Sequence, residues 1–303
     1  MKSLRLALVV CLTFAALASC GKRSDAPRPL AIAPVASATA GLRGGAPCAG
    51  VTLPCGQFAT PAEALRAVLV DRPLVLAIGE AHAQKNATVA SSAKRAETQL
   101  LPALKGQASD LLVELMSPPA GCQKATDGAR EQQKVVTEKQ APTDQNEYVA
   151  LGAAARRLGI AADLLRPSCD DLSAVSDAGA DAIDVSLKLI KRLTLAKVIA
   201  LRGRNDAPAA DHEKMVVTYG GALHNDVAPS AERAPWSFGP ELSAALNGRY
   251  VELDVYVPEF IDGSEKWQKM SWFAGCDVRK LGGAVTLFQT APQSFVMVFA
   301  AGQ

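Results

Sequence analysis

Short apolar segments that alternate with helix-forming segments are the feature that most constrains the fold of this chain. The apolar runs lie at 73–78, 111–113, 160–165 and 215–219. Segments of helical composition separate them, which predicts parallel strands joined by crossover helices. Two later strands, Ala284–Phe288 and Phe295–Phe299, are separated by a short turn and predict a closing antiparallel hairpin. We therefore expect an α/β fold, with a mixed and mostly parallel sheet covered by helices and antiparallel strands at the C-terminus.

Two segments add detail to this expectation. In the predicted helix Ala178–Leu201, four apolar residues share one face: Ile183, Leu187, Ile190 and Leu193. Residues Val251–Val257 alternate apolar side chains with Glu252, Asp254 and Tyr256, which predicts a strand with one solvated face. The segment 123–146 is rich in polar residues and is expected to be an exposed helix or a mobile excursion.

The first nineteen residues have the composition of an export signal. Lys2 and Arg5 flank the start of the apolar run Leu6–Leu17, which is too short to span a bilayer comfortably. The run ends in Leu17-Ala18-Ser19-Cys20, which resembles the lipobox of bacterial lipoproteins. That resemblance implies cleavage before Cys20, a diacylglyceryl group on its sulfur, and membrane attachment through several acyl chains. By resemblance to the lipoprotein sorting rules of two-membrane bacteria, Gly21 in place of an aspartate favours the outer membrane. An ordinary cleaved signal peptide is the alternative.

Composition divides the remainder into a tether and a domain. Residues 20–47 are rich in Ala, Pro, Gly and Ser and predict a lipidated flexible tether, whereas 48–303 have the size of a single domain. Of the 32 Lys and Arg residues, removal of Lys2 and Arg5 leaves 30, which equals the 30 Asp and Glu residues. Without a net positive charge or a basic patch interleaved with aromatics, a nucleic-acid partner is not expected.

Five cysteines follow Cys20 in the sequence: Cys48, Cys55, Cys122, Cys169 and Cys276. In an oxidising compartment the short separation of Cys48 and Cys55 predicts a disulfide between them. Cys122 and Cys169 each follow an apolar strand-like segment and could join neighbouring connections, which would leave Cys276 over. No closely spaced cysteine pair or following histidine supports a zinc site.

Two similar motifs place titratable residues at predicted strand ends. They are Gly79-Glu80-Ala81-His82 and Gly221-Ala222-Leu223-His224. Glu114 follows a third apolar run. Because the carboxyl ends of parallel strands share one edge of a sheet, these side chains are expected to converge there. Two imidazoles and two carboxylates suit a divalent metal, or a base with its orienting partner acting on water.

Several of the histidines and tryptophans have an alternative, purely structural interpretation. Each strand-end histidine could instead be a hydrogen-bonded structural residue. His212 lies in a polar stretch and is interpreted as a loop residue outside the site. Trp236, Trp267 and Trp272 are expected to cover the sheet rather than to line a pocket.

The segment from about Pro73 to Asp226 resembles the family that groups erythromycin esterases, ChaN-like haem-binding lipoproteins and Tiki-type proteases. The similarity rests on the strings at 75–82, 112–116 and 217–224. Its pattern of a Gly-Glu motif with histidine, a strand-end glutamate and a later Gly-x-x-His matches Glu80, His82, Glu114 and His224. The pattern also contains an arginine, for which Arg204 is the better match and Arg202 the fallback.

These observations lead us to expect an envelope-tethered hydrolase acting on a small molecule or a peptide. Glu80, His82 and His224 would hold manganese, cobalt or zinc, or a polarised water, with Glu114 as general base or orienting group. Arg204 would bind a carboxylate or stabilise oxyanion charge. The resemblance implies haem binding as the alternative, with a tyrosine or a motif histidine as ligand. A non-catalytic envelope scaffold is the third possibility.

Overall fold

The computed structural model describes residues 42–48, 51–85, 87–204, 213–261, 267, 270–274 and 283–302. The chain divides into two units, Met1–Ala36 and Ser37–Gln303, and every described residue belongs to the second. The predicted signal peptide, Cys20, His212 and Cys276 lie outside the described residues. Within the described ranges, no helix is both long enough and apolar enough to cross a membrane.

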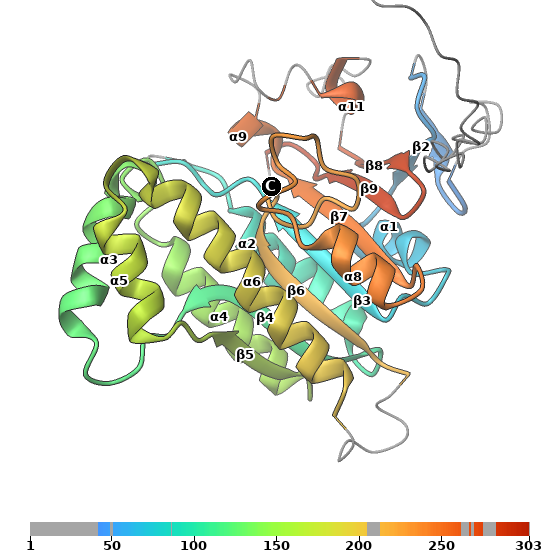
Figure 1. Ribbon diagram of the computed structural model, residues 1–303. Coiled ribbons are helices and arrows are strands. Elements are labelled where there is room, and N and C mark those ends of the chain that lie inside the picture. The colour runs from blue at the N-terminus through green and yellow to red at the C-terminus, as the bar shows by residue number, and fades with distance from the viewer. Residues whose placement is uncertain are drawn as a thin grey trace, which may run out of the picture. The chain divides into compact units, whose positions relative to one another are not determined.

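The described residues form a mixed sheet of nine strands in the order β1-β2-β8-β9-β7-β3-β6-β4-β5 (Figure 1). The strands are β1 Ala46–Pro47, β2 Cys55–Phe58, β3 Val75–Glu80, β4 Ala108–Met116, β5 Ala161–Leu165, β6 Met215–Gly221, β7 Tyr250–Tyr256, β8 Val285–Ala291 and β9 Ser294–Val298. Pairing is parallel from β9 through to β5 and antiparallel from β1 to β9. The predicted α/β class is therefore confirmed, including its C-terminal antiparallel strands.

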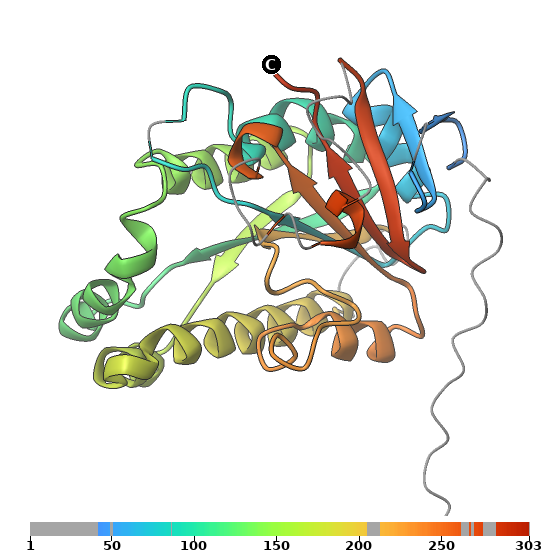
Figure 2. The ribbon, with the colours of Figure 1, turned by 90° about the horizontal axis from the view of Figure 1, so that it is seen from above.

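Helices cover both faces of this sheet (Figure 2). They are α1 Pro61–Val68, α2 Ser92–Arg95, α3 Gln123–Thr137, α4 Asp144–Arg157, α5 Cys169–Asp177, α6 Ala182–Arg202, α8 Gly239–Ala245, α9 Pro258–Ile261 and α11 Ser271–Ala274. Helices α1 and α4 pack on one face, where Leu76 and Ile78 of β3 point. Helices α6 and α8 pack on the other face, against Val75 and Ala77. Successive side chains of a strand point to opposite faces, so Glu80 has the direction of Ile78 and faces the α4 side.

Three local features differ from the sequence expectations. Residues 87–105 are one of the segments of helical composition between the apolar runs, and a single helix is expected there. The structure has the short α2 followed by a π turn and a 3-10 turn that contains Pro102, since proline has no N–H for a regular helix. The sheet includes β1, which lies inside the predicted tether and pairs with β2. Strand β7 was expected to have a solvated face, but all seven of its residues are buried. Its polar face is turned toward other buried polar groups, described below.

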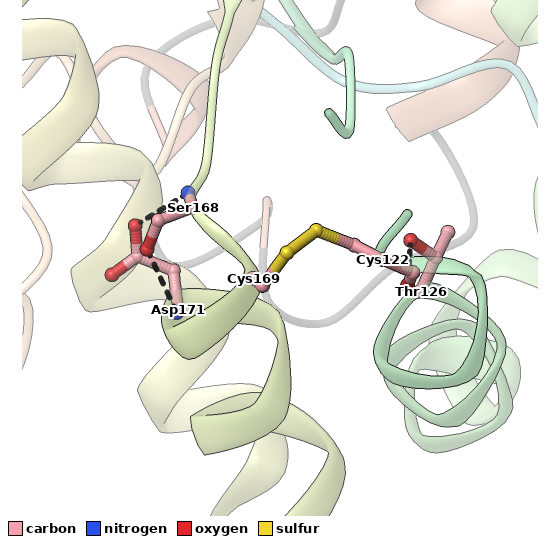
Figure 3. The surroundings of a disulfide bond; sticks show 5 residues. All are labelled: Cys122, Thr126, Ser168, Cys169 and Asp171. Carbon is pink, nitrogen blue, oxygen red and sulfur yellow. Dashed lines mark hydrogen bonds between the residues drawn. A yellow bond between two sulfur atoms is a disulfide. The ribbon is translucent and has the colours of Figure 1, made fainter. Parts of the chain in front are cut away.

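Two disulfides join neighbouring connections. The first is between Cys48 and Cys55, with a Cα–Cα distance of 5.6 Å. The second, between Cys122 and Cys169 with a Cα–Cα distance of 5.3 Å, links the starts of α3 and α5 (Figure 3). These helices follow the adjacent parallel strands β4 and β5, so both cysteines emerge at the same edge of the sheet. The bond therefore fixes α3 and α5 beside each other above that edge.

Candidate active site

Four of the five predicted site residues lie around one cavity at the carboxyl edge of the parallel strands. Glu80 ends β3, Glu114 lies near the end of β4, and His224 follows β6. Together with His82 they line a cavity of about 570 Å³, which also borders α3, α4, α5 and α6. Ligand pockets commonly have volumes of roughly 300–1,000 Å³. The strand-end position of each motif thus places the four side chains on a common space.

Glu80 is buried and accepts hydrogen bonds on both carboxylate oxygens. Its Oε1 accepts from the Tyr148 hydroxyl at 2.8 Å and lies 2.9 Å from His82 Nδ1, and its Oε2 accepts from the Tyr219 hydroxyl. Burial and the charge of Glu80 raise the pKa of both tyrosines well above 10, so both hydroxyls stay protonated donors. With three donors, Glu80 is suited to orient His82 rather than to bind a metal.

His82 is held as a cation by its surroundings. Partial burial acts to lower its pKa, but the hydrogen bond and charge of Glu80, with the charges of Glu114 and Asp144, raise that pKa to about 9. The side chain keeps 29% exposure. Since Nδ1 is bonded to Glu80, Nε2 is the free donor, and it lies 3.4 Å from where a Cβ on Gly221 would be. His82 therefore presents an N–H to the cavity at neutral pH.

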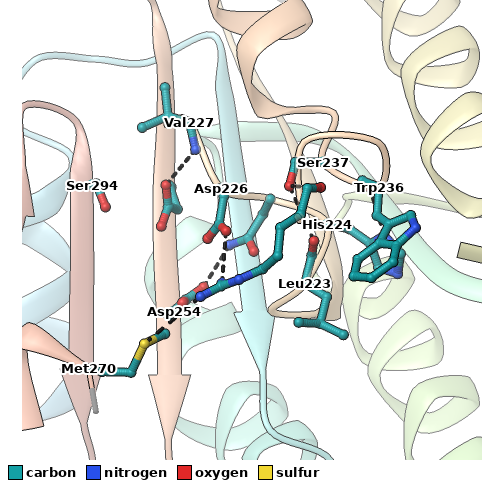
Figure 4. A network of polar contacts seen from close by, with 12 residues as sticks. Leu223, His224, Asp226, Val227, Trp236, Ser237, Asp254, Met270 and Ser294 are labelled. Atoms are coloured by element: carbon teal, nitrogen blue, oxygen red, sulfur yellow. Dashed lines mark hydrogen bonds and ion pairs between the residues drawn. The ribbon is translucent and has the colours of Figure 1, made fainter. Parts of the chain in front are cut away.

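Glu114 and His224 form a second pair, and Glu114 lies beside Gly221. Glu114 Oε2 accepts from the Gly221 N–H at 2.9 Å. His224 Nδ1 lies 2.9 Å from the carbonyl oxygen of Trp236 (Figure 4). A carbonyl can only accept, so Nδ1 carries a proton, and in the neutral ring Nε2 then carries the lone pair. That Nε2 lies 3.9 Å from Glu114 Oε1, too far for a direct hydrogen bond.

Glycines in the motifs make room for these side chains. A Cβ on Gly220 would overlap the Glu114 carboxylate, and a Cβ on Gly79 would lie 2.5 Å from Asp254 Oδ1. The two glycines face each other in the register of β3 and β6. The space that a side chain would take at these two glycines is therefore filled by neighbouring protein carboxylates.

Arg204 is not part of this cavity, which corrects the sequence assignment. Its guanidinium donates to Asp110 Oδ2 at 2.5 Å, close to the start of β4. Helix α6 runs antiparallel to the strands it connects, so the residues after α6 emerge at the amino edge of the sheet, opposite the site. The fallback Arg202 donates to the Lys214 carbonyl at that same edge. The arginines that do line the cavity are Arg130 of α3 and Arg233, which follows β6.

Asp144, at the start of α4, is a cavity residue that the sequence reasoning missed. It is 9% exposed, and its Oδ2 has no hydrogen-bond partner among the described residues. Burial raises its pKa to about 7; the charge of His82 opposes the rise, while Glu80 and Glu147 add to it. Asp144 therefore contributes to the charge that keeps His82 protonated.

The predicted metal set of Glu80, His82 and His224 is not drawn together as a compact cluster. Within the described part of the chain, the only group of three or more metal-binding side chains with ligand atoms all within 4.8 Å of one another is Asp226, Glu252 and Asp254. Glu252 and Asp254 come from the polar face of β7, and Asp226 follows β6. Three clustered carboxylates were not anticipated, because a buried β7 was not expected.

The acidic group of Asp226, Glu252 and Asp254 is held by surrounding donors. Arg233 donates to Asp226 Oδ2 at 2.8 Å, and the Val227 N–H donates to Glu252 Oε2 at 2.7 Å (Figure 4). Asp254 accepts from Asn225 and from the Tyr256 hydroxyl, both at 2.8 Å.

Burial raises the pKa of Glu252 to about 8, helped by the charge of Asp254, and it raises the pKa of Asp254 to about 7. Near neutral pH the group therefore retains protons, and protonation together with Arg233 compensates its charge.

Haem ligation by tyrosine does not fit the arrangement. The chain has four tyrosines. Each is buried and donates its hydroxyl to a protein acceptor: Tyr148 and Tyr219 to Glu80, Tyr250 to the Asn225 carbonyl, and Tyr256 to Asp254. A tyrosinate ligand would require one of these hydroxyls to leave its acceptor and lose its proton.

Comparison with known proteins adds little to the site. No protein-family model matches the chain, and no curated protein matches it. A crystal structure of a Bacillus cereus protein is similar, with 11% sequence identity and a TM-score of 0.38, covering 80% of this chain and 93% of that one.

Proposed function

We propose that this protein is a hydrolase whose cavity holds a substrate carbonyl beside Glu114, His224 and His82. The observation that carries the proposal is the 3.9 Å separation between Glu114 Oε1 and His224 Nε2 inside the cavity. One group is an acceptor carboxylate and the other a lone-pair nitrogen whose tautomer is fixed by the Trp236 carbonyl. A water placed between them can donate a proton to either, which is the requirement for general-base activation.

The roles of the two pairs differ. Glu114 and His224 accept the proton of the attacking water, while the protonated His82 donates its Nε2–H to the oxygen that gains negative charge. Glu80, Tyr148 and Tyr219 position His82, because their hydrogen bonds fix both the carboxylate and the ring. In this proposal His82, and not Arg204 as expected from the sequence, stabilises the negative charge on the oxygen.

Glu114 and His224, rather than the three residues expected from the sequence, are also the pair that would hold a divalent metal, and they would then be its ligands instead of the proton acceptors. Carboxylate oxygen and imidazole nitrogen are ordinary ligands for manganese, cobalt and zinc. The second ring nitrogen of His224 is bonded to a backbone carbonyl, as is common for metal-binding histidines. When bound, such an ion would act as a Lewis acid and increase the acidity of water.

The test is a hydrolase screen with ester, amide and phosphoester substrates, with and without added manganese, cobalt or zinc, together with metal analysis of the purified domain. Glu114→Gln and His224→Ala are each expected to lower turnover by ~10²–10⁴-fold. Glu131→Gln, an exposed glutamate on α3, is the matched control and keeps full activity. Full activity in both site variants would refute the proposal, and failure of every substrate would favour the scaffold alternative.

The domain is further proposed to be tethered to the bacterial envelope through a lipidated Cys20, in the outer membrane. The support is the motif at 17–21, with the apolar run before it. Cells fed labelled palmitate should yield a labelled protein in the membrane fraction. Cys20→Ala should yield an unlabelled precursor, and labelling that survives this change would contradict the tether.

A further inference from the structure

The apolar stripe of α6 faces the cavity instead of packing fully into the core. Ile183, Leu187 and Ile190 follow the spacing of one helix face, and all three line the cavity and remain half-buried. Ile190 packs against the apolar cluster on the α8 face of the sheet. Ile183 and Leu187 belong to none of the four apolar clusters formed by the described residues. A stripe of this kind normally stabilises a helix by burial against protein, so its exposure to a cavity points to an apolar ligand.

Helices α3 and α5 add further apolar side chains to the cavity lining. They are Leu172 and Val175 of α5 with Ala129 and Val136 of α3, and Val136 is 43% exposed. On α3 they are accompanied by the polar lining residues Thr126, Arg130, Gln133 and Thr137. The disulfide between Cys122 and Cys169 holds these two helices together at their starts. Figure 2 shows α3, α5 and the first turns of α6 grouped on the carboxyl side of β4 and β5. The cavity thus has an apolar extension that leads away from the polar residues at the strand ends.

The shape of this extension favours a chain over a compact ring system. From Ile183 to Ile190 a helix rises about 10 Å. Three apolar side chains spaced along that length form an elongated wall. The polar end carries the groups proposed above to act on a carbonyl, and the apolar extension begins next to it.

We infer that the substrate is a carboxylic ester or amide with a medium-length acyl chain, and that the chain lies along Ile183, Leu187 and Ile190 of α6. This inference deepens the proposed hydrolase function and rests on it for the position of the carbonyl. The chain-binding part is nevertheless measurable without turnover. Each buried methylene is expected to raise affinity roughly fourfold until the extension is filled.

The first experiment measures binding alone, by isothermal titration calorimetry of the mature domain and of its Glu114→Gln variant with octanamide and acetamide. Octanamide, which is six methylenes longer, should bind on the order of a thousandfold more tightly than acetamide to both proteins. Equal affinities would overturn the inference. Chain-dependent binding without cleavage of any ester would retain the chain site and reject the hydrolase.

The second experiment places the chain. Ile183→Trp fills part of the extension and should weaken octanamide binding at least roughly tenfold, because a chain and an indole cannot occupy the same space. Ile199→Trp is the matched control: the same substitution on the same helix, at a residue that is 49% exposed and outside the cavity. Leu187→Ala is a second, smaller change that should weaken binding several-fold with the fold intact. Unchanged octanamide affinity in both Ile183→Trp and Leu187→Ala would show that the chain does not lie on α6.

The third experiment connects binding to turnover. With p-nitrophenyl acetate, butyrate and octanoate as substrates, kcat/KM of the wild type should rise with each longer chain. A wild type that cleaves acetate at least as efficiently as octanoate would overturn the acyl-chain inference while leaving the hydrolase proposal in place.

Discussion

The charge state of His82 is the most direct test of the site's electrostatics, and Glu80→Gln is the change that tests it. Glu80 raises the pKa of His82 through a 2.9 Å hydrogen bond and through its charge. A rise from 6.5 to about 9 corresponds to about 3 kcal/mol, and the 29% exposure of the ring reduces the expected contribution to about 2 kcal/mol. Without the carboxylate, burial dominates, so the pKa of His82 should fall to 6.5 or below.

The stability consequence has a defined sign. A histidine whose pKa is raised by folding stabilises the protein fully below its unfolded pKa of 6.5, and this contribution is lost as the pH rises through about 9. Urea unfolding of the wild type should therefore show about 2 kcal/mol more loss of stability over this pH range than unfolding of Glu80→Gln. NMR titration of the imidazole proton resonances reports the pKa itself.

Tyr219→Phe separates charge from hydrogen bonding in this experiment. It removes one donor to Glu80 but keeps the carboxylate, so His82 should still titrate near 9. A wild-type His82 that titrates near 6.5, or a Glu80→Gln protein in which it still titrates near 9, would refute the reasoning.

Three further predictions concern packing, covalent links and the acidic group. Gly220→Ala should destabilise the fold by about 1–3 kcal/mol in urea unfolding and displace Glu114. Gly283→Ala is the control and should be neutral, because nothing lies within 4 Å of a Cβ at that position. Equal effects of the two substitutions would contradict the close approach of Glu114 to Gly220. Replacing Cys122 and Cys169 by serine opens a loop with a sequence separation of 47 and should lower the free energy of unfolding by about 4 kcal/mol. Replacing Cys48 and Cys55, which are separated by 7, should lower it by about 2 kcal/mol. The opposite order of the two losses would reject the loop-entropy argument. Burial raises the pKa of Asp254 from 3.8 to about 7, so the free energy of unfolding should fall as the pH rises from about 4 to about 7. The fall should be smaller in Asp254→Asn. Identical pH profiles of the two proteins would show that Asp254 titrates normally.

The local sequence determined most of the elements and their order along the chain, but not the order of the strands in the sheet. Apolar runs between helical segments are a local signal, and they yielded the α/β class and the C-terminal hairpin. Because motif residues at the ends of parallel strands meet at one edge, the sequence also placed Glu80, His82, Glu114 and His224 around a common space. It could not supply their partners. Tyr148 comes from α4 and Tyr219 from β6, and only the packing of α4 on the sheet brings both hydroxyls to Glu80.

Tertiary structure alone decided which faces are covered. The alternation of apolar and polar residues in β7 predicts a half-exposed strand, yet Glu252 and Asp254 are buried. The segment after β6 covers the polar face of β7 and supplies hydrogen-bond donors such as the Val227 N–H and Asn225 to it. The chain direction of α6 carries Arg204 to the opposite edge of the sheet, which local spacing cannot reveal. The apolar stripe of α6 has the same periodicity whether it faces a core or a cavity. Its exposure depends on how α3 and α5 are held above the sheet, and that is a property of the folded chain.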